Sequence, residues 1–162
     1  MFIDKHKKSI RILCRILFGL YIVALVYFLF FAEMLGRTNV NRTYHYNLIL
    51  FKEISRFIVY RRQLGFKAVF LNLAGNMFIF APFGFLLPIM NRRLKGFFQV
   101  TLLSLELSLA VETVQLITKV GSFDVDDILL NTVGGILGYV CFYVIQHRRD
   151  RLADQRRSMT KS

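Results

Sequence analysis

The sequence contains few of the residues on which small soluble or metal-stabilised folds depend. It has two Cys, two Pro, no Trp and ten acidic residues among 162. The two Cys have no metal-ligand spacing around them, which excludes a disulfide scaffold and a zinc scaffold. The chain is nevertheless 55% hydrophobic, with 17 Phe and 7 Tyr, and this excludes a disordered chain. Its length corresponds to about one domain.

Long apolar runs are what the chain has in excess. Four stretches of 17 to 23 residues lack Lys, Arg and Asp, namely 16–32, 68–90, 96–117 and 128–146. A helix needs about 20 apolar residues to cross a hydrocarbon core of ~30 Å. The first run extends to 12–32 if Arg15 reaches back to the membrane interface. We therefore predict an all-α integral membrane bundle of four transmembrane helices.

The 22 basic residues, which give a net charge of +12, predict the topology. Fourteen of them lie in the N-terminal segment, the link 91–95 and the C-terminal tail. By the positive-inside rule, both termini of this multi-pass protein are cytoplasmic. Residues 1–147 then form the membrane domain and 148–162 a basic cytoplasmic tail. Because topology explains the charge, no nucleic acid is expected as a partner.

The first link does not follow this distribution, because it carries seven basic residues on the expected outer side. Within it, residues 48–60 (LILFKEISRFIVY) mix apolar residues with Lys52, Glu53 and Arg56. Such a pattern is typical of an amphipathic helix in the membrane interface, between the first and second spans. An ordinary extracellular loop helix explains it equally well.

Polar residues within the third span fall into two groups. A stripe within about 80° on a helical wheel should face protein or water, and it consists of Thr101, Ser104, Ser108, Glu112 and Gln115. Glu106 lies elsewhere, about 120° from Glu112 and near Gln99. At mid-membrane depth, Glu106 must be protonated or find its own partner.

The second span carries Asn72 and Asn76 on one face, followed by Pro82, where we expect a kink, and by Gly84. The two amides fit a binding role or interhelical hydrogen bonding equally well.

The fourth span carries Asn131, Gly134 and Gly138 on one stripe. The GxxxG pair lets another helix approach closely. Packing within the chain is favoured over homodimerisation, although a homo-oligomer stays possible.

Three acidic residues precede the fourth span. Asp124 can cap its helix, with Asp127 near the positive end of the helix dipole. The excess acids, with Asp127 and Asn131 four residues apart, could bind a cation or a basic ligand group. Depth then brings the polar groups of three helices to one outward-facing layer. The predicted binding pocket comprises Asn72, Asn76, Glu112, Gln115, Asp124, Asp126, Asp127 and Asn131.

Over about residues 47–139, these segments resemble the VanZ-like family of small bacterial membrane proteins. The matching pieces follow the family's order: Asn47-Leu48, NLAGNMFIFAPFGFLLP (72–88), SLAVETVQ (108–115) and FDVDDILLNTVGGILGY (123–139). Two departures are Gly121, where many members carry Arg, and Glu106, which the family pattern does not include.

The resemblance implies a protein of the bacterial cell membrane with an accessory part in resistance to lipid-tailed glycopeptide antibiotics such as teicoplanin. It brings no established enzymatic mechanism and no cofactor. The expected partners are the bilayer and a lipid-linked wall precursor, an envelope lipid or the antibiotic. One alternative is a membrane enzyme with a divalent metal on Asp124, Asp126 and Asp127 and with Glu112 as base. Another is a structural or assembly protein.

Overall fold

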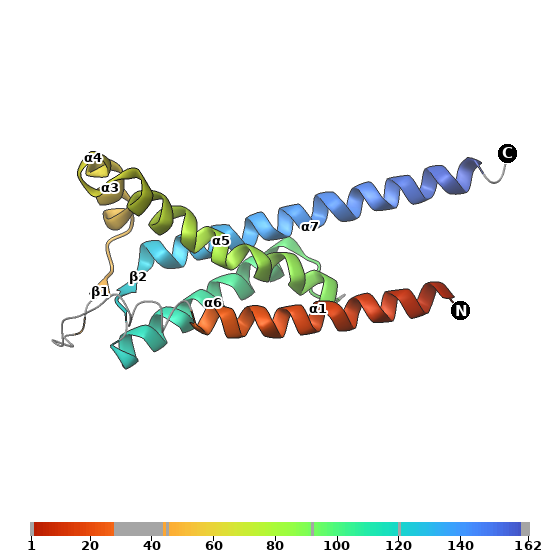
Figure 1. Cartoon of the computed structure of the whole chain (residues 1–162), viewed down its shortest axis with the longest axis horizontal. Helices are drawn as coiled ribbons and strands as arrows, with labels where there is room; N and C mark the ends of the chain where they lie inside the picture. Colours follow the sequence, from red (N-terminus) through yellow and green to blue (C-terminus); the bar gives the residue numbers. More distant parts are fainter. Residues whose placement is uncertain (1, 28–43, 45, 92, 120, 160–162) are drawn as a thin grey trace.

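Helices account for most of the chain, and the computed structural model describes residues 2–27, 44, 46–91, 93–119 and 121–159. The elements in order are α1 (Phe2–Val26), β1 (Tyr46–Asn47), α3 (Lys52–Val59), α4 (Arg61–Leu64), α5 (Phe66–Met90), α6 (Phe97–Thr118), β2 (Phe123–Asp124) and α7 (Val125–Met159). Figure 1 shows the two chain termini at one end of an elongated molecule, with α3, α4 and the two strands at the other.

Three of the described helices are long and apolar enough to cross a membrane: Phe66–Met90, Phe97–Thr118 and Val125–Arg156. The predicted helical membrane architecture is confirmed at this level. Of the predicted first span, Ile12–Val26 forms a shorter apolar helix, and residues 28–32 lie outside the described residues. The last helix is longer than the predicted span and includes most of the basic tail.

Helix α5 contacts each of the other long helices. It follows Gly65, whose φ of 81° is a conformation that residues with a Cβ rarely adopt. The helix then extends through Pro82 and Pro88. Its contact with α1 includes a hydrogen bond of 3.0 Å from the Tyr21 hydroxyl to the Ile79 carbonyl. This bond satisfies a polar group inside the bundle.

Glycines bring the backbones of α5 and α7 into direct contact. A Cβ at Gly84 would lie 1.8 Å from the carbonyl oxygen of Gly135, and a Cβ at Gly138 would lie 1.9 Å from that of Ala81. Gly134 also meets the backbone of α5. These approaches are possible only because glycine lacks a side chain, as in close-packed membrane helices. The structure thus places Gly84, Gly134 and Gly138 in a contact within the chain.

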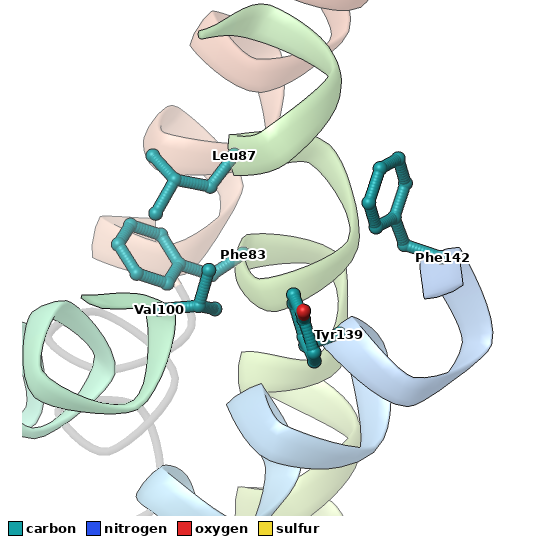
Figure 2. Close-up of a cluster of buried hydrophobic side chains, with 5 residues drawn as sticks. All are labelled: Phe83, Leu87, Val100, Tyr139 and Phe142. Atoms are coloured by element: carbon teal, nitrogen blue, oxygen red, sulfur yellow. The ribbon is translucent and has the colours of Figure 1, made fainter. Parts of the chain in front are cut away.

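An apolar core fills the bundle toward the end that carries the termini. The core consists of Phe83 and Leu87 of α5, Val100 of α6, and Tyr139 and Phe142 of α7. Figure 2 shows Phe83, Leu87 and Val100 close together on one side of α5, with Phe142 on the other side of that helix. Much of the remaining apolar surface faces outward, as expected for helices whose solvent is lipid.

Substituting Gly84 by Ala tests the α5–α7 contact. The added methyl group meets the Gly135 backbone, so we expect Gly84→Ala to lower the free energy of unfolding by about 1–3 kcal/mol. The measurement is thermal unfolding in detergent micelles, followed by circular dichroism. Gly75→Ala on the same helix is the control, since no atom lies within 4 Å of its added Cβ. The control should be neutral or stabilising by up to about 1 kcal/mol. Equal stability of the two variants would contradict the close approach.

Candidate functional site

Helix α6 ends and helix α7 begins at the end of the molecule opposite the termini (Figure 1). Hydrogen-bonded polar side chains gather there. Two short strands organise this end. They pair in parallel, with Tyr46 opposite Phe123 and Asn47 opposite Asp124. The pairing sets the segment before α3 directly against the start of α7.

Asp124 connects three parts of the chain. Its backbone N–H donates to Oε2 of Glu112 at 3.0 Å. Its Oδ1 accepts from Nδ2 of Asn47 at 3.1 Å and from the backbone N–H of Asp126 at 2.8 Å. The bond from Asp126 is the N-cap bond of α7 that the sequence predicted for Asp124. Helix α6, both strands and α7 are therefore joined through one residue, by its backbone N–H and its carboxylate.

The surroundings of Asp124 change its acidity. Burial raises the pKa of its carboxyl group above the usual value, because the charged form loses hydration. The hydrogen bonds from the Asp126 N–H and the Asn47 amide, together with the positive charge of Arg56, oppose the shift without cancelling it. Asp124 thus holds a proton more readily than an exposed aspartate.

Asp126 forms the N-terminal cap of a different helix. Its Oδ1 accepts from the backbone N–H of Phe51, and its Oδ2 accepts from those of Glu53 at 2.8 Å and Ile54 at 3.2 Å. Phe51 stands at the N-cap position of α3 in a left-handed conformation and supplies no side-chain cap. The carboxylate of Asp126 is 1% exposed. It therefore supplies, from 72 to 75 residues away, the acceptors that the first turn of α3 requires.

Two further hydrogen bonds connect α7 to α5 and α6. Nδ2 of Asn76 donates to Oδ1 of Asp127, and both side chains are half-buried. Nδ2 of Asn131 donates to the Ser108 hydroxyl at 3.0 Å, and Asn131 is 2% exposed. Within the described part of the chain, Oδ1 of Asn131 is a buried acceptor without a hydrogen-bond donor. Burying a polar atom unpaired is costly, so this acceptor suits a bound water.

We call this group the polar layer. It consists of Asn47, Asn76, Ser108, Glu112, Gln115, Asp124, Asp126, Asp127 and Asn131. Gln115 is buried on the same face of α6 as Glu112. Asn72 is half-buried one turn before Asn76, and no hydrogen bond connects its side chain to the described residues. The structure thus brings together the predicted candidates with the exception of Asn72.

The geometry bears on the predicted metal alternative. Both oxygens of Asp126 face backbone N–H groups, and one oxygen of Asp127 faces an amide. Over residues 2–27, 44, 46–91, 93–119 and 121–159, no three His, Cys, Asp or Glu residues are grouped so that they could hold a metal ion. The acids that looked surplus in the sequence therefore act mainly as acceptors for the chain's own N–H groups.

Two contributions escaped the sequence reasoning. The first is the capping of α3 by Asp126, since a cap is normally sought within the same segment. The second is Asn47, whose Oδ1 also accepts from the backbone N–H of Ile49 at 3.2 Å. An Asn side chain that accepts from the backbone N–H two residues later is a recognisable turn signal. The bond from Asn47 to Asp124 is a long-range contact, which the local sequence does not indicate.

A helical bundle with this apolar exterior and a polar layer at one end is the architecture of a small membrane protein. A family model described as VanZ/LLP1 matches residues 18–146. The chain belongs to this family. It is also similar to Protein VanZ of Enterococcus faecium, with 35% identity over 133 residues that cover 79% of this chain and 72% of that protein. No solved structure matches the chain.

Replacing Asp126 by Ala tests the cap on α3. Loss of the carboxylate leaves three N–H groups without their acceptor, and hydrogen bonds to charged groups contribute about 1.5–3 kcal/mol. We expect amide exchange at Phe51, Glu53 and Ile54 to accelerate about 10- to 100-fold, measured by hydrogen–deuterium exchange. Exchange in the middle of α5 should be unchanged. Asp150→Ala is the control, because that carboxylate contacts the exposed Gln146 side chain on α7. Unaltered exchange in α3 would show that another group holds this helix.

Proposed function

We propose that this VanZ/LLP1 family member lowers susceptibility to lipid-tailed glycopeptide antibiotics by binding an envelope ligand at the polar layer. The ligand is the antibiotic, a lipid-linked wall precursor or an envelope lipid. Family membership supports the resistance role. The observation that carries the binding role is the convergence of amides and carboxylates from α5, α6 and α7 at one end of the bundle.

The topology of this proposal is a four-span bundle with both termini in the cytoplasm. The two termini lie at one end of the molecule, and the C-terminal part of α7 carries several Arg residues (Figure 1). The positive-inside rule assigns such an end to the cytoplasm. The polar layer then faces the outer leaflet, where wall precursors and glycopeptides are encountered.

Within the polar layer, the half-buried members are the ones that a ligand reaches. Asn76 and Asp127 meet this condition. The half-buried Asn72 lies one turn before Asn76 on the same helix. An anionic carboxylate beside amides suits an ammonium or peptide N–H group of a ligand. Glu112 and Asp124 are buried, and they hold the surrounding backbone in place.

Helices α3 and α4 provide a second contact region for the same ligand. None of the residues in either helix is buried, and Ile58 and Val59 are 49% and 67% exposed. Arg56, Arg61 and Arg62 lie among these apolar side chains. A basic, amphipathic surface beside a membrane attracts anionic headgroups and acyl chains. In this proposal α3 and α4 lie on the outer leaflet and hold the lipid part of the ligand.

The test compares a strain with and without this gene in susceptibility to teicoplanin and to vancomycin, which lacks the lipid tail. We expect the protein to raise the inhibitory concentration of teicoplanin several-fold and to leave that of vancomycin unchanged. Asp127→Ala and Glu112→Ala should each abolish most of the effect. For Asp127, losing a charged hydrogen-bond acceptor lowers ligand affinity about tenfold or more.

Membrane insertion of each variant is verified by fractionation, and Asp150→Ala serves as the matched acidic control outside the polar layer. Full resistance in inserted Asp127→Ala and Glu112→Ala variants would refute binding at the polar layer. If Gly134→Ile alone removed the function, the purely structural alternative would be selected. Gly134 contacts the α5 backbone, so that variant disturbs helix packing while every side chain of the polar layer stays present.

A further inference from the structure

Glu106 is a carboxyl group that the polar layer does not use. It lies on α6 two residues from both Ser104 and Ser108, which are fully buried in the core face of that helix. Two residues correspond to about 160° around a helix, so Glu106 points away from the bundle. Its side chain is exposed, and within the described part of the chain it makes no hydrogen bond or ion pair.

The depth of Glu106 makes this exposure costly. Its neighbour Leu107 packs against a core cluster that includes Leu25 and Phe80. Glu106 itself lies nine residues after the first residue of α6, Phe97, or about 14 Å along the helix axis. A span crosses a hydrocarbon core of ~30 Å, so the carboxyl group is near its middle. Acidic groups at that depth are found paired, not facing lipid.

The exposed face around Glu106 has a seven-residue repeat. Gln99, Glu106 and Thr113 occur at intervals of seven, and Leu102 and Leu109 occupy the intervening positions of the same repeat. All five side chains are exposed. A seven-residue repeat has two interface positions, and Leu at one of them is typical of two helices that pack as a left-handed pair. We call these five residues the α6 stripe.

We propose that the α6 stripe is a self-association surface, on which α6 of a second copy of this chain packs in parallel. Copies inserted with one topology have parallel α6 helices, so a two-fold axis along the membrane normal sets like residues against each other. Glu106 of one copy then meets Glu106 of the other at the centre of the contact.

Self-complementary polar groups identify a second copy as the occupant. A carboxyl group in its protonated form, an amide and a hydroxyl each both donate and accept hydrogen bonds. Within α6, Oε1 of Gln99 already accepts from the Gly96 N–H, and the Thr113 hydroxyl donates to the Leu109 carbonyl. Glu106 is therefore the member of the series whose side chain is available to bond its own counterpart, and two carboxyl groups can share a proton. Leu102 and Leu109 are 54% and 47% exposed. They supply the apolar packing between the polar residues of the α6 stripe.

This inference does not rest on the proposed function. Around α6, Glu112 and Gln115 of the polar layer lie about 120° and about 180° from Glu106, on the buried face of the helix. Self-association would therefore leave both polar layers of the pair accessible.

Cysteine cross-linking in native membranes tests the proposal. In a Cys14→Ala, Cys141→Ala background, a Leu109→Cys chain should form a disulfide-linked dimer under mild oxidation. Phe78→Cys is the control, because Phe78 is 66% exposed on α5 beside Ile79, which packs against the same cluster as Leu107. The control should stay monomeric. Added Glu106→Leu should reduce the Leu109→Cys dimer on the order of tenfold, whereas Glu106→Gln should retain it.

Helix content by circular dichroism verifies that each variant is folded, as expected for changes on an exposed face. A monomeric Leu109→Cys chain, equal cross-linking at Phe78→Cys, or a dimer indifferent to Glu106→Leu would each overturn the proposal. Cross-linking of Leu109→Cys solely to another protein would overturn it as well, since it would assign the stripe to a different partner.

Discussion

The buried carboxylate of Asp126 connects the elements at the end of the molecule opposite the termini. Asp126 supplies the acceptors for the first turn of α3, and its own N–H completes the N-cap of α7 through Asp124. Asp126 thus takes part in the N-caps of two helices from distant parts of the sequence, as the acceptor for α3 and as a donor to Asp124 in α7. No residue of α3 is buried, so the hydrogen bonds to Asp126 are a main contribution to fixing where that helix lies. The strand pairing and the Asn47–Asp124 hydrogen bond hold the preceding segment at the same end of the molecule.

Helix packing sets the separation at which these polar contacts form. Gly134 lies seven residues after Asp127, or two helical turns, and it touches the backbone of Met77, the residue next to Asn76. The approach of α5 to α7 therefore brings the Asn76 amide to the Asp127 carboxylate. A larger residue at position 134 would move apart groups that it never touches. The geometry of the polar layer therefore depends on the close packing at these glycines.

Features with a strong local pattern could be predicted from the sequence. The apolar runs correspond to α5, α6 and α7, and the wheel analysis placed Ser104, Ser108 and Glu112 on a face that is buried. The N-cap role of Asp124 also has a local signature, and the structure confirms it. Long-range contacts could not be predicted in this way. Nothing near Asp126 in the sequence indicates that α3 lacks a cap of its own. The extension of α7 through the tail was also missed, because that segment is charged and exposed and has no apolar periodicity.

Helix α7 has 35 residues and is therefore about 52 Å long, whereas a hydrocarbon core measures about 30 Å. Some 20 Å of continuous helix thus stand clear of the bilayer at the end that carries the termini. Arg148 and Arg149 follow directly after the apolar part, within reach of lipid phosphates, while Arg156 lies roughly 12 Å further along the axis. Arg151 lies between them, so the positive charge continues along the helix from the headgroup region into the aqueous phase. The same rigid helix therefore carries basic residues at two depths, some that contact headgroups and some that are accessible to a partner in the aqueous phase.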